Sequence, residues 1–191
     1  MAGSSVRLPQ GPLAAMADSD PLAHVWTLLE SVTDPEIPVV SLREMGVLRA
    51  ITQSAAGLQI TITPTYSGCP AMDQMEDDIR LALQQAGLQG EVITRLAPAW
   101  SSDWITDTAR DKLRAYGIAP PQGRHCSAAA ATPPAQVVQL APRRAAPPAL
   151  VPCPQCGSED TTETSHFGST ACKALYRCLA CREPFDYFKP Y

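Results

Sequence analysis

Two Cys-x-x-Cys pairs near the end of the sequence constrain the fold more than any other feature. Cys153-Pro-Gln-Cys156 and Cys178-Leu-Ala-Cys181 have 21 residues between them. Each pair is typical of a tight knuckle whose backbone amides point at the sulfurs, and four thiolates make a closed tetrahedral zinc site. Residues 153–191 are too few to be held by a hydrophobic core alone. We therefore predict a C-terminal four-cysteine zinc ribbon that is stabilised by structural zinc.

Two features of this region leave alternatives open. Arg182, not glycine, follows the second knuckle, and the 21-residue separation is one residue beyond the usual range. An iron-sulfur cluster or redox thiols are the alternative uses of the four cysteines. Cys172 is a fifth nearby thiol, which is either a small buried residue of a ribbon strand or a thiol that exchanges metal. We interpret His166 as a surface residue, because four cysteines already saturate zinc.

The chain has 7 cysteines, and the compartment decides how they are interpreted. Residues 1–19 lack a charged start followed by an apolar run, and no stretch reaches the roughly 18 consecutive apolar residues of a membrane helix. We therefore expect a cytoplasmic protein without a membrane partner. In that reducing compartment the cysteines are thiols and metal ligands rather than disulfides.

Charge is distributed unevenly along the chain, whose formal net charge is -4. Residues 20–118 carry 13 acidic and 7 basic side chains, whereas residues 119–191 carry 5 acidic and 7 basic ones. The acidic body argues against a nucleic-acid partner. A zinc-ribbon nucleic-acid binder fits only the basic tail and is the least favoured alternative.

Composition predicts four segments. Residues 119–152 contain eight prolines and many alanines, which is typical of an extended linker. We interpret Cys126, within this linker, as an exposed thiol without function. Residues 1–19 are predicted to be a flexible leader, residues 20–118 a domain with its own core, and residues 153–191 the ribbon.

Hydrophobic periodicity in residues 20–118 predicts an α+β domain in the order α-β-β-α-β-α, built on a small mixed three-stranded sheet. The first helix begins at an Asp20-Pro21 cap and ends before Pro35. The strands are predicted at 46–52, 58–63 and 91–96, the central helix between Pro70 and Gly87, and the last helix from a cap at 101–103 to Gly117. The first two strands form a hairpin, and the crossover through the central helix places the third strand parallel to one of them.

Cys69 follows the second predicted strand and precedes the helix that Pro70 opens. We predict that it is the N-cap of this helix, where unpaired amides and the helix dipole favour a thiolate. Gly68 permits a sharp turn that leaves the sulfur accessible. Cys69 is therefore a candidate nucleophile or soft-metal ligand, and the alternative is a cysteine buried as a small apolar residue.

The segment Asp34-Pro35-Glu36-Ile37-Pro38 follows the first predicted helix, and its two prolines rigidify it. In one interpretation, Asp34 and Glu36 lie near Cys69 and bind metal or set the protonation of the thiol. In the other, this is a polar helix exit in which Asp34 is a turn residue.

Three segments together closely resemble the MIP18-type (DUF59) iron-sulfur assembly domain: 34–46 (DPEIPVVSLREMG), 63–70 (TPTYSGCP) and 98–105 (PAWSSDWI). The ribbon sequences at 153–157 and 167–189 are similar to one branch of this family, which serves the phenylacetyl-CoA epoxidase system of aerobic phenylacetate degradation. The resemblance carries the family's motif cysteine to Cys69 and its acidic loop to Asp34 and Glu36. It also favours a role for Cys172.

The resemblance implies an accessory protein without catalysis of its own. Such a protein assists the assembly of iron-sulfur or iron centres, and it carries iron or a transient iron-sulfur cluster. The implied partners are the phenylacetyl-CoA oxygenase and iron-sulfur reductase subunits. The alternative is a structural or regulatory component of the oxygenase that is needed in every turnover.

Overall fold

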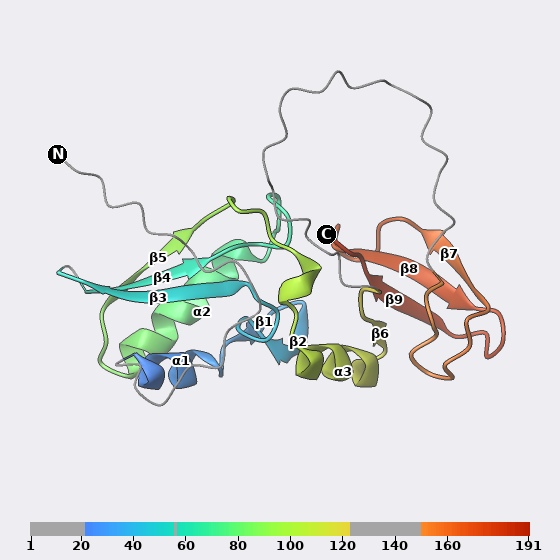
Figure 1. Ribbon diagram of the computed structural model, residues 1–191, viewed down its shortest axis with the longest axis horizontal. Coiled ribbons are helices and arrows are strands. Elements are labelled where there is room, and N and C mark those ends of the chain that lie inside the picture. The colour runs from blue at the N-terminus through green and yellow to red at the C-terminus, as the bar shows by residue number, and fades with distance from the viewer. Residues whose placement is uncertain (1–21, 56, 123–149) are drawn as a thin grey trace, which may run out of the picture.

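The computed structural model describes residues 22–55, 57–122 and 150–191 (Figure 1). The predicted leader at 1–19 and Cys126, with most of the predicted linker, lie outside these ranges. Within the described ranges, no helix is long and apolar enough to cross a membrane.

The amino-terminal region, residues 22–117, has the predicted α+β architecture. Its elements are α1 (Ala23–Leu29), β1 (Thr33–Asp34), β2 (Ile37–Ser41), β3 (Leu48–Ser54), β4 (Gly57–Ile62), α2 (Met72–Gln85), β5 (Gly90–Thr94), a 3-10 turn (Ser102–Trp104) and α3 (Asp107–Tyr116). The three-stranded sheet has the order β3-β4-β5, with β3 antiparallel and β5 parallel to β4. The predicted hairpin and crossover are thus confirmed.

Helices α1 and α2 lie together along one side of this sheet (Figure 1). The apolar stripe of α2 is buried at Met75, Ile79 and Leu83. These side chains join Leu58 and Ile60 of β4 in the main core cluster. The spacing of apolar residues in the sequence therefore identified the buried face of α2 correctly.

Two local predictions differ from the structure. The segment around Pro35 is a hairpin, because β1 and β2 pair antiparallel across it. The last predicted helix is divided in two: the Ser101 hydroxyl caps the 3-10 turn, and the Thr106 hydroxyl accepts the Ala109 amide at 3.1 Å to begin α3. Extended backbone at Ile105 separates the two pieces. A second cap within a helical pattern is the local reason for the break.

Gly46 is needed where the turn before β3 meets the 3-10 turn. Its φ is +68°, and a Cβ added there would lie 2.5 Å from the Cβ of Trp104. Close by, the indole of Trp100 donates to the Met45 carbonyl at 3.1 Å. These contacts pack the segments 34–46 and 98–105 against each other, although they are far apart in the sequence.

The ribbon region, residues 118–122 and 150–191, contains a four-stranded sheet. Its strands are β6 (Ile118–Ala119), β7 (Thr161–Ser165), β8 (Lys173–Cys178) and β9 (Pro184–Phe188), in the order β6-β9-β8-β7. β6 follows α3 directly and pairs parallel with β9. The ribbon sheet therefore takes its fourth strand from the end of the amino-terminal region.

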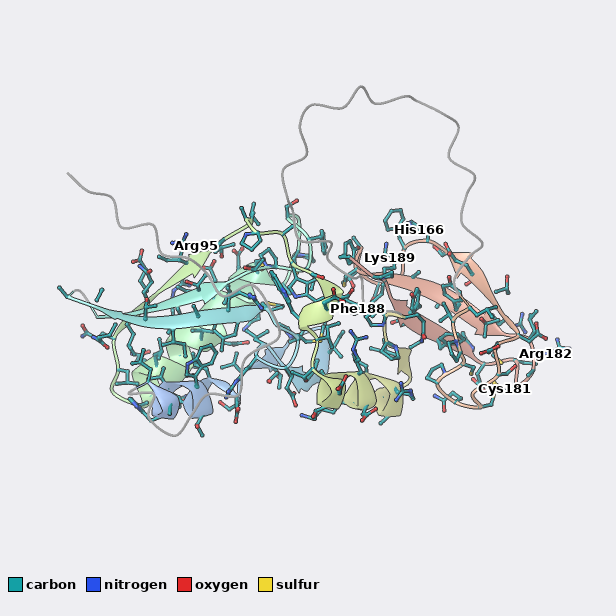
Figure 2. The ribbon with its side chains drawn as sticks, in the orientation of Figure 1. Arg95, His166, Cys181, Arg182, Phe188 and Lys189 are labelled. Carbon is teal, nitrogen blue, oxygen red and sulfur yellow. The ribbon has the colours of Figure 1, made fainter. Side chains whose placement is uncertain are left out.

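The ribbon is packed against the amino-terminal region rather than separate from it. Phe188 is 1% exposed and belongs to the core cluster of the amino-terminal region. The Trp100 ring lies 5.9 Å from the Phe188 ring and 6.2 Å from the Tyr191 ring. The backbone amide of Ser102 donates to the Tyr191 carbonyl at 3.1 Å. Figure 2 shows Phe188 and Lys189 at this junction, with Cys181 and Arg182 at the far end of the ribbon.

Candidate thiol and metal sites

Four cysteines gather at the far end of the ribbon. Cys153 and Cys156 precede β7, Cys178 ends β8, and Cys181 lies in the turn before β9. Their sulfurs all lie within 4.8 Å of one another. The sulfurs of Cys153 and Cys181 are 3.8 Å apart, and those of Cys156 and Cys178 are 3.6 Å apart.

These separations fit a zinc ion. Four thiolates at about 2.3 Å from a tetrahedral zinc are about 3.8 Å from one another. Both knuckles also have the required backbone, because Gly157 has φ +73° and Arg182 has φ +70°. Arg182 thus adopts the left-handed conformation for which glycine is usually chosen. The four cysteines can hold one zinc ion, whose role would be structural because all four positions are filled by protein.

The second knuckle is arranged to favour a thiolate. The Cys181 amide donates to the Cys178 sulfur at 3.4 Å. This hydrogen bond is the largest of the effects that lower the pKa of Cys178 to about 7. An amide that points at the sulfur stabilises its charged form, which is the form that binds metal.

Cys69 lies in the loop between β4 and α2, but it does not cap the helix. The N-cap of α2 is Ala71, two residues later, so the prediction of a capping thiol is wrong. Cys69 is half-buried, and burial raises the pKa of its thiol despite a hydrogen bond from the Ala71 amide. The predicted preference for thiolate is therefore also wrong, because loss of water around the sulfur outweighs the nearby amides.

Asp34 is the last residue of β1 and is 7% exposed. Its carboxylate accepts the Glu36 amide at 2.8 Å, which closes the turn between β1 and β2. Burial is the main cause that raises the pKa of Asp34. Glu36 is exposed on the same turn. Asp34 is thus both a turn residue and a buried carboxylate, so the two interpretations of this segment are compatible.

Cys172 lies one residue before β8 and is 9% exposed. It packs in the core cluster of the amino-terminal region, not in the smaller cluster of the ribbon. Six residues of extended chain span about 20 Å, so Cys172 is remote from Cys178 at the other end of β8. Cys172 therefore cannot serve as a spare ligand for the four-cysteine site.

The structure brings Cys69, Asp34 and Cys172 together at the junction of the two regions. The negative charge of Asp34 raises the pKa of both thiols, although burial is the larger cause for each. Glu36 is near enough to affect Cys69 in the same way. His166 is not part of this group, because its side chain is 65% exposed and faces Glu163.

Lys173 is a member of this neighbourhood that the sequence did not identify. It is 4% exposed, and its ammonium group lies 3.3 Å from Asp186. Its charge also acts on Asp34 and Cys172, where it lowers the pKa and partly opposes burial. The only signal in the sequence is a lysine beside a cysteine, and burial of that lysine is decided by the docking of the ribbon.

Both parts of the chain match known families. Residues 22–94 match the family described as iron-sulfur cluster assembly protein, and residues 140–189 match the PaaD zinc beta ribbon domain. These matches confirm the resemblance found in the motifs, including the ribbon.

Named relatives are consistent with these matches. Over 171 residues the chain is 47% identical to the putative D component of the 1,2-phenylacetyl-CoA epoxidase of Escherichia coli (strain K12), which covers 88% of this chain and 93% of that protein. It is 31% identical over 89 residues to the Fe-S protein maturation auxiliary factor of Porphyromonas gingivalis, covering 45% of this chain and 84% of that protein. A crystal structure of a DUF59 domain from Bacillus anthracis is 27% identical and covers 48% of this chain and 89% of that one, with a TM-score of 0.45.

Proposed function

The chain belongs to the family of the D component of 1,2-phenylacetyl-CoA epoxidase, and on that premise we propose that it is an accessory protein of a phenylacetyl-CoA epoxidase system. It assists the assembly of iron-sulfur or iron centres in the oxygenase or reductase subunits. It works in the cytoplasm, where reducing conditions keep its cysteines available for metal. The ribbon cysteines hold a structural zinc and take no direct part in assembly.

The observation that carries this proposal is the position of Cys69. Its half-buried thiol lies on a loop beside the buried carboxylate of Asp34, within a domain that matches the iron-sulfur assembly family. A thiol and a carboxylate together suit ferrous iron, since a thiolate is a soft donor and a carboxylate a hard one.

The chemistry required of these residues is transfer rather than catalysis. Partial exposure of Cys69 lets a partner approach the sulfur. Its raised pKa means that the thiol is largely protonated without cargo, so the proton competes with the metal. Weak holding is useful for a carrier, because cargo that is bound too tightly would not pass to the recipient.

The proposal is tested by producing the oxygenase and reductase subunits in cells with and without this chain. We expect purified partner subunits from cells that lack the chain to contain less iron and less acid-labile sulfide. Partner subunits that are already loaded should turn over phenylacetyl-CoA without the chain, because an assembly factor is needed only once. Activity that rises with added chain, when partners are fully metallated, would contradict the proposal and favour a component of turnover.

Cysteine variants make this test specific. Cys69→Ser should leave the fold and the zinc content unchanged but fail to support iron loading, because a hydroxyl does not replace a soft thiolate ligand. Cys126→Ser, in the predicted linker, is the matched control and should support loading fully. Equal iron content of the partners with both variants would reject the role of Cys69.

A further inference from the structure

We propose that the two regions share a second metal site, in which Cys69, Asp34 and Cys172 bind one soft divalent cation such as ferrous iron. This inference rests on the proposed function and names the ligands of its cargo. Its new element is that the ribbon supplies a ligand, so neither region binds the cargo fully by itself.

Cys172 is held at the junction by its neighbours in the ribbon. Its carbonyl accepts the Lys189 amide at 2.9 Å, and its sulfur lies 3.1 Å from the Thr170 hydroxyl. The preceding residue, Ala171, accepts the Tyr191 hydroxyl at 3.1 Å. The cysteine is therefore fixed by contacts on both sides rather than carried on a free loop.

The same segment contacts the loop that carries Cys69. The Tyr66 hydroxyl lies against the backbone amide of Ala171, and its pKa is raised chiefly by burial and further by Cys69 and Cys172. Tyr66 and Cys69 belong to one turn, since the Cys69 amide donates to the Tyr66 carbonyl at 3.3 Å. Cys69 and Tyr66 both pack against the cluster that contains Cys172. Two thiols more than 100 positions apart in the sequence thus share one neighbourhood.

The charges of this neighbourhood favour a cation. Asp34 is almost fully buried, while Lys173, the nearby base, pairs with Asp186. Across residues 22–55, 57–122 and 150–191, no basic side chain forms an ion pair with Asp34. A buried carboxylate without a counter-ion is costly, and a bound cation offsets that cost. On binding, the two thiol protons pass to solvent.

The donor set is looser than that of the ribbon. Among the described residues, only the four ribbon cysteines have sulfurs that lie within 4.8 Å of one another. Cys69 is partly exposed whereas Cys172 and Asp34 are buried, so the group is open on the Cys69 side. A group with one open side suits an ion that must enter and leave, whereas structural metal sites are closed.

The test is a titration of the full chain, holding its ribbon zinc, with Co²⁺ without oxygen. Cobalt-thiolate bonds give a charge-transfer absorption band that reports each sulfur ligand. We expect one Co²⁺ per chain with all zinc retained. Cys69→Ser and Cys172→Ser should each remove about half of the band and weaken binding about tenfold or more. Cys126→Ser is the matched control and should bind Co²⁺ as the original chain does.

Asp34→Asn separates the carboxylate from the thiols. It keeps an oxygen for the Glu36 amide, so it should weaken Co²⁺ binding while the intensity of the band at saturation is unchanged. Cys172→Ala is a second variant at the buried position, and unchanged zinc content and circular dichroism identify the variants that fold.

Three outcomes would overturn this inference. Co²⁺ binding by Cys172→Ser and Cys172→Ala equal to that of the original chain would leave the site to Cys69 alone, with the proposed function intact. Absence of any Co²⁺ beyond the ribbon metal would remove the site. Loss of zinc in step with cobalt uptake, unaffected by changes at Cys69 or Cys172, would assign the cobalt to the ribbon. Normal Co²⁺ binding with unchanged iron loading of partners would instead reject the proposed function.

Discussion

The two thiol groups of this protein lie at opposite ends of the ribbon and are built in opposite ways. At the far end, four sulfurs from two knuckles lie within 4.8 Å of one another. At the junction, Cys69, Asp34 and Cys172 come from three separate segments and two regions. The first group is closed by local backbone geometry, and the second exists only because the regions dock. The difference indicates a structural role for one and an exchange role for the other.

The protonation of the thiols differs in the same sense. In the ribbon, a backbone amide lowers the pKa of Cys178 to about 7. At the junction, burial raises the pKa of both Cys69 and Cys172. Thiolates are therefore favoured at the first group and opposed at the second, which fits tight and weak retention of metal respectively.

Removal of the ribbon metal should have the largest effect. Cys178→Ser, or a strong chelator, should unfold β7, β8 and β9, because so small a sheet depends on its metal for stability. Elemental analysis should give one zinc per original chain, and amide spectra should lose the ribbon signals while those of the α2 core remain. Cys69→Ser should retain zinc and both sets of signals. A ribbon that stays folded in chelator would remove the contrast between the two groups.

Loss of the docking contact should come next. Phe188→Ala should lower the free energy of unfolding by about 3–5 kcal/mol, because this ring is buried in the core of the other region. It should also make Cys172 react faster with an alkylating reagent, while zinc is retained. Urea denaturation and mass spectrometry measure the two effects. Leu175→Ala, at a side chain that is 37% exposed, is the control and should change little. Equal effects of the two substitutions would show that the regions are not coupled at Phe188.

The smallest expected effect concerns the amino-terminal region alone. Glu44 accepts hydrogen bonds from Lys112 at 2.7 Å and from the Ser41 amide at 2.9 Å. Burial acts to raise the pKa of Glu44, but these bonds outweigh it and the pKa is lowered. Its contribution to stability is therefore present above the ordinary glutamate pKa and is lost as the pH falls through the lowered value.

Glu44→Gln should therefore lower the free energy of unfolding of this region by about 0.5–1 kcal/mol at neutral pH. The difference from the original chain should shrink as the pH falls below about 4.5. Urea denaturation at several pH values measures it, with zinc content followed alongside. A difference that grows in acid would contradict the assigned role of Glu44.

The sequence by itself determined those features that depend on local geometry. The spacing of the two cysteine pairs predicted the ribbon, because a knuckle is formed by a few consecutive residues. Apolar periodicity predicted α2, the β3–β4 hairpin and the parallel β5, because each pattern reports which face is buried. The hairpin at Pro35 and the break at Ile105 were missed, since two prolines and a continuing apolar pattern gave the opposite local signal.

Only the tertiary structure decided the chemistry of the junction. The sequence named Cys69, Asp34, Glu36 and Cys172 as candidates, but it placed Cys172 in the ribbon and predicted a capping thiolate at Cys69. Docking put Cys172 against the amino-terminal core and buried Lys173 beside it. Burial then outweighed the amide at Cys69 and raised its pKa. The pKa of a side chain depends on how much water its neighbours exclude, and those neighbours come from segments whose proximity no local pattern specifies.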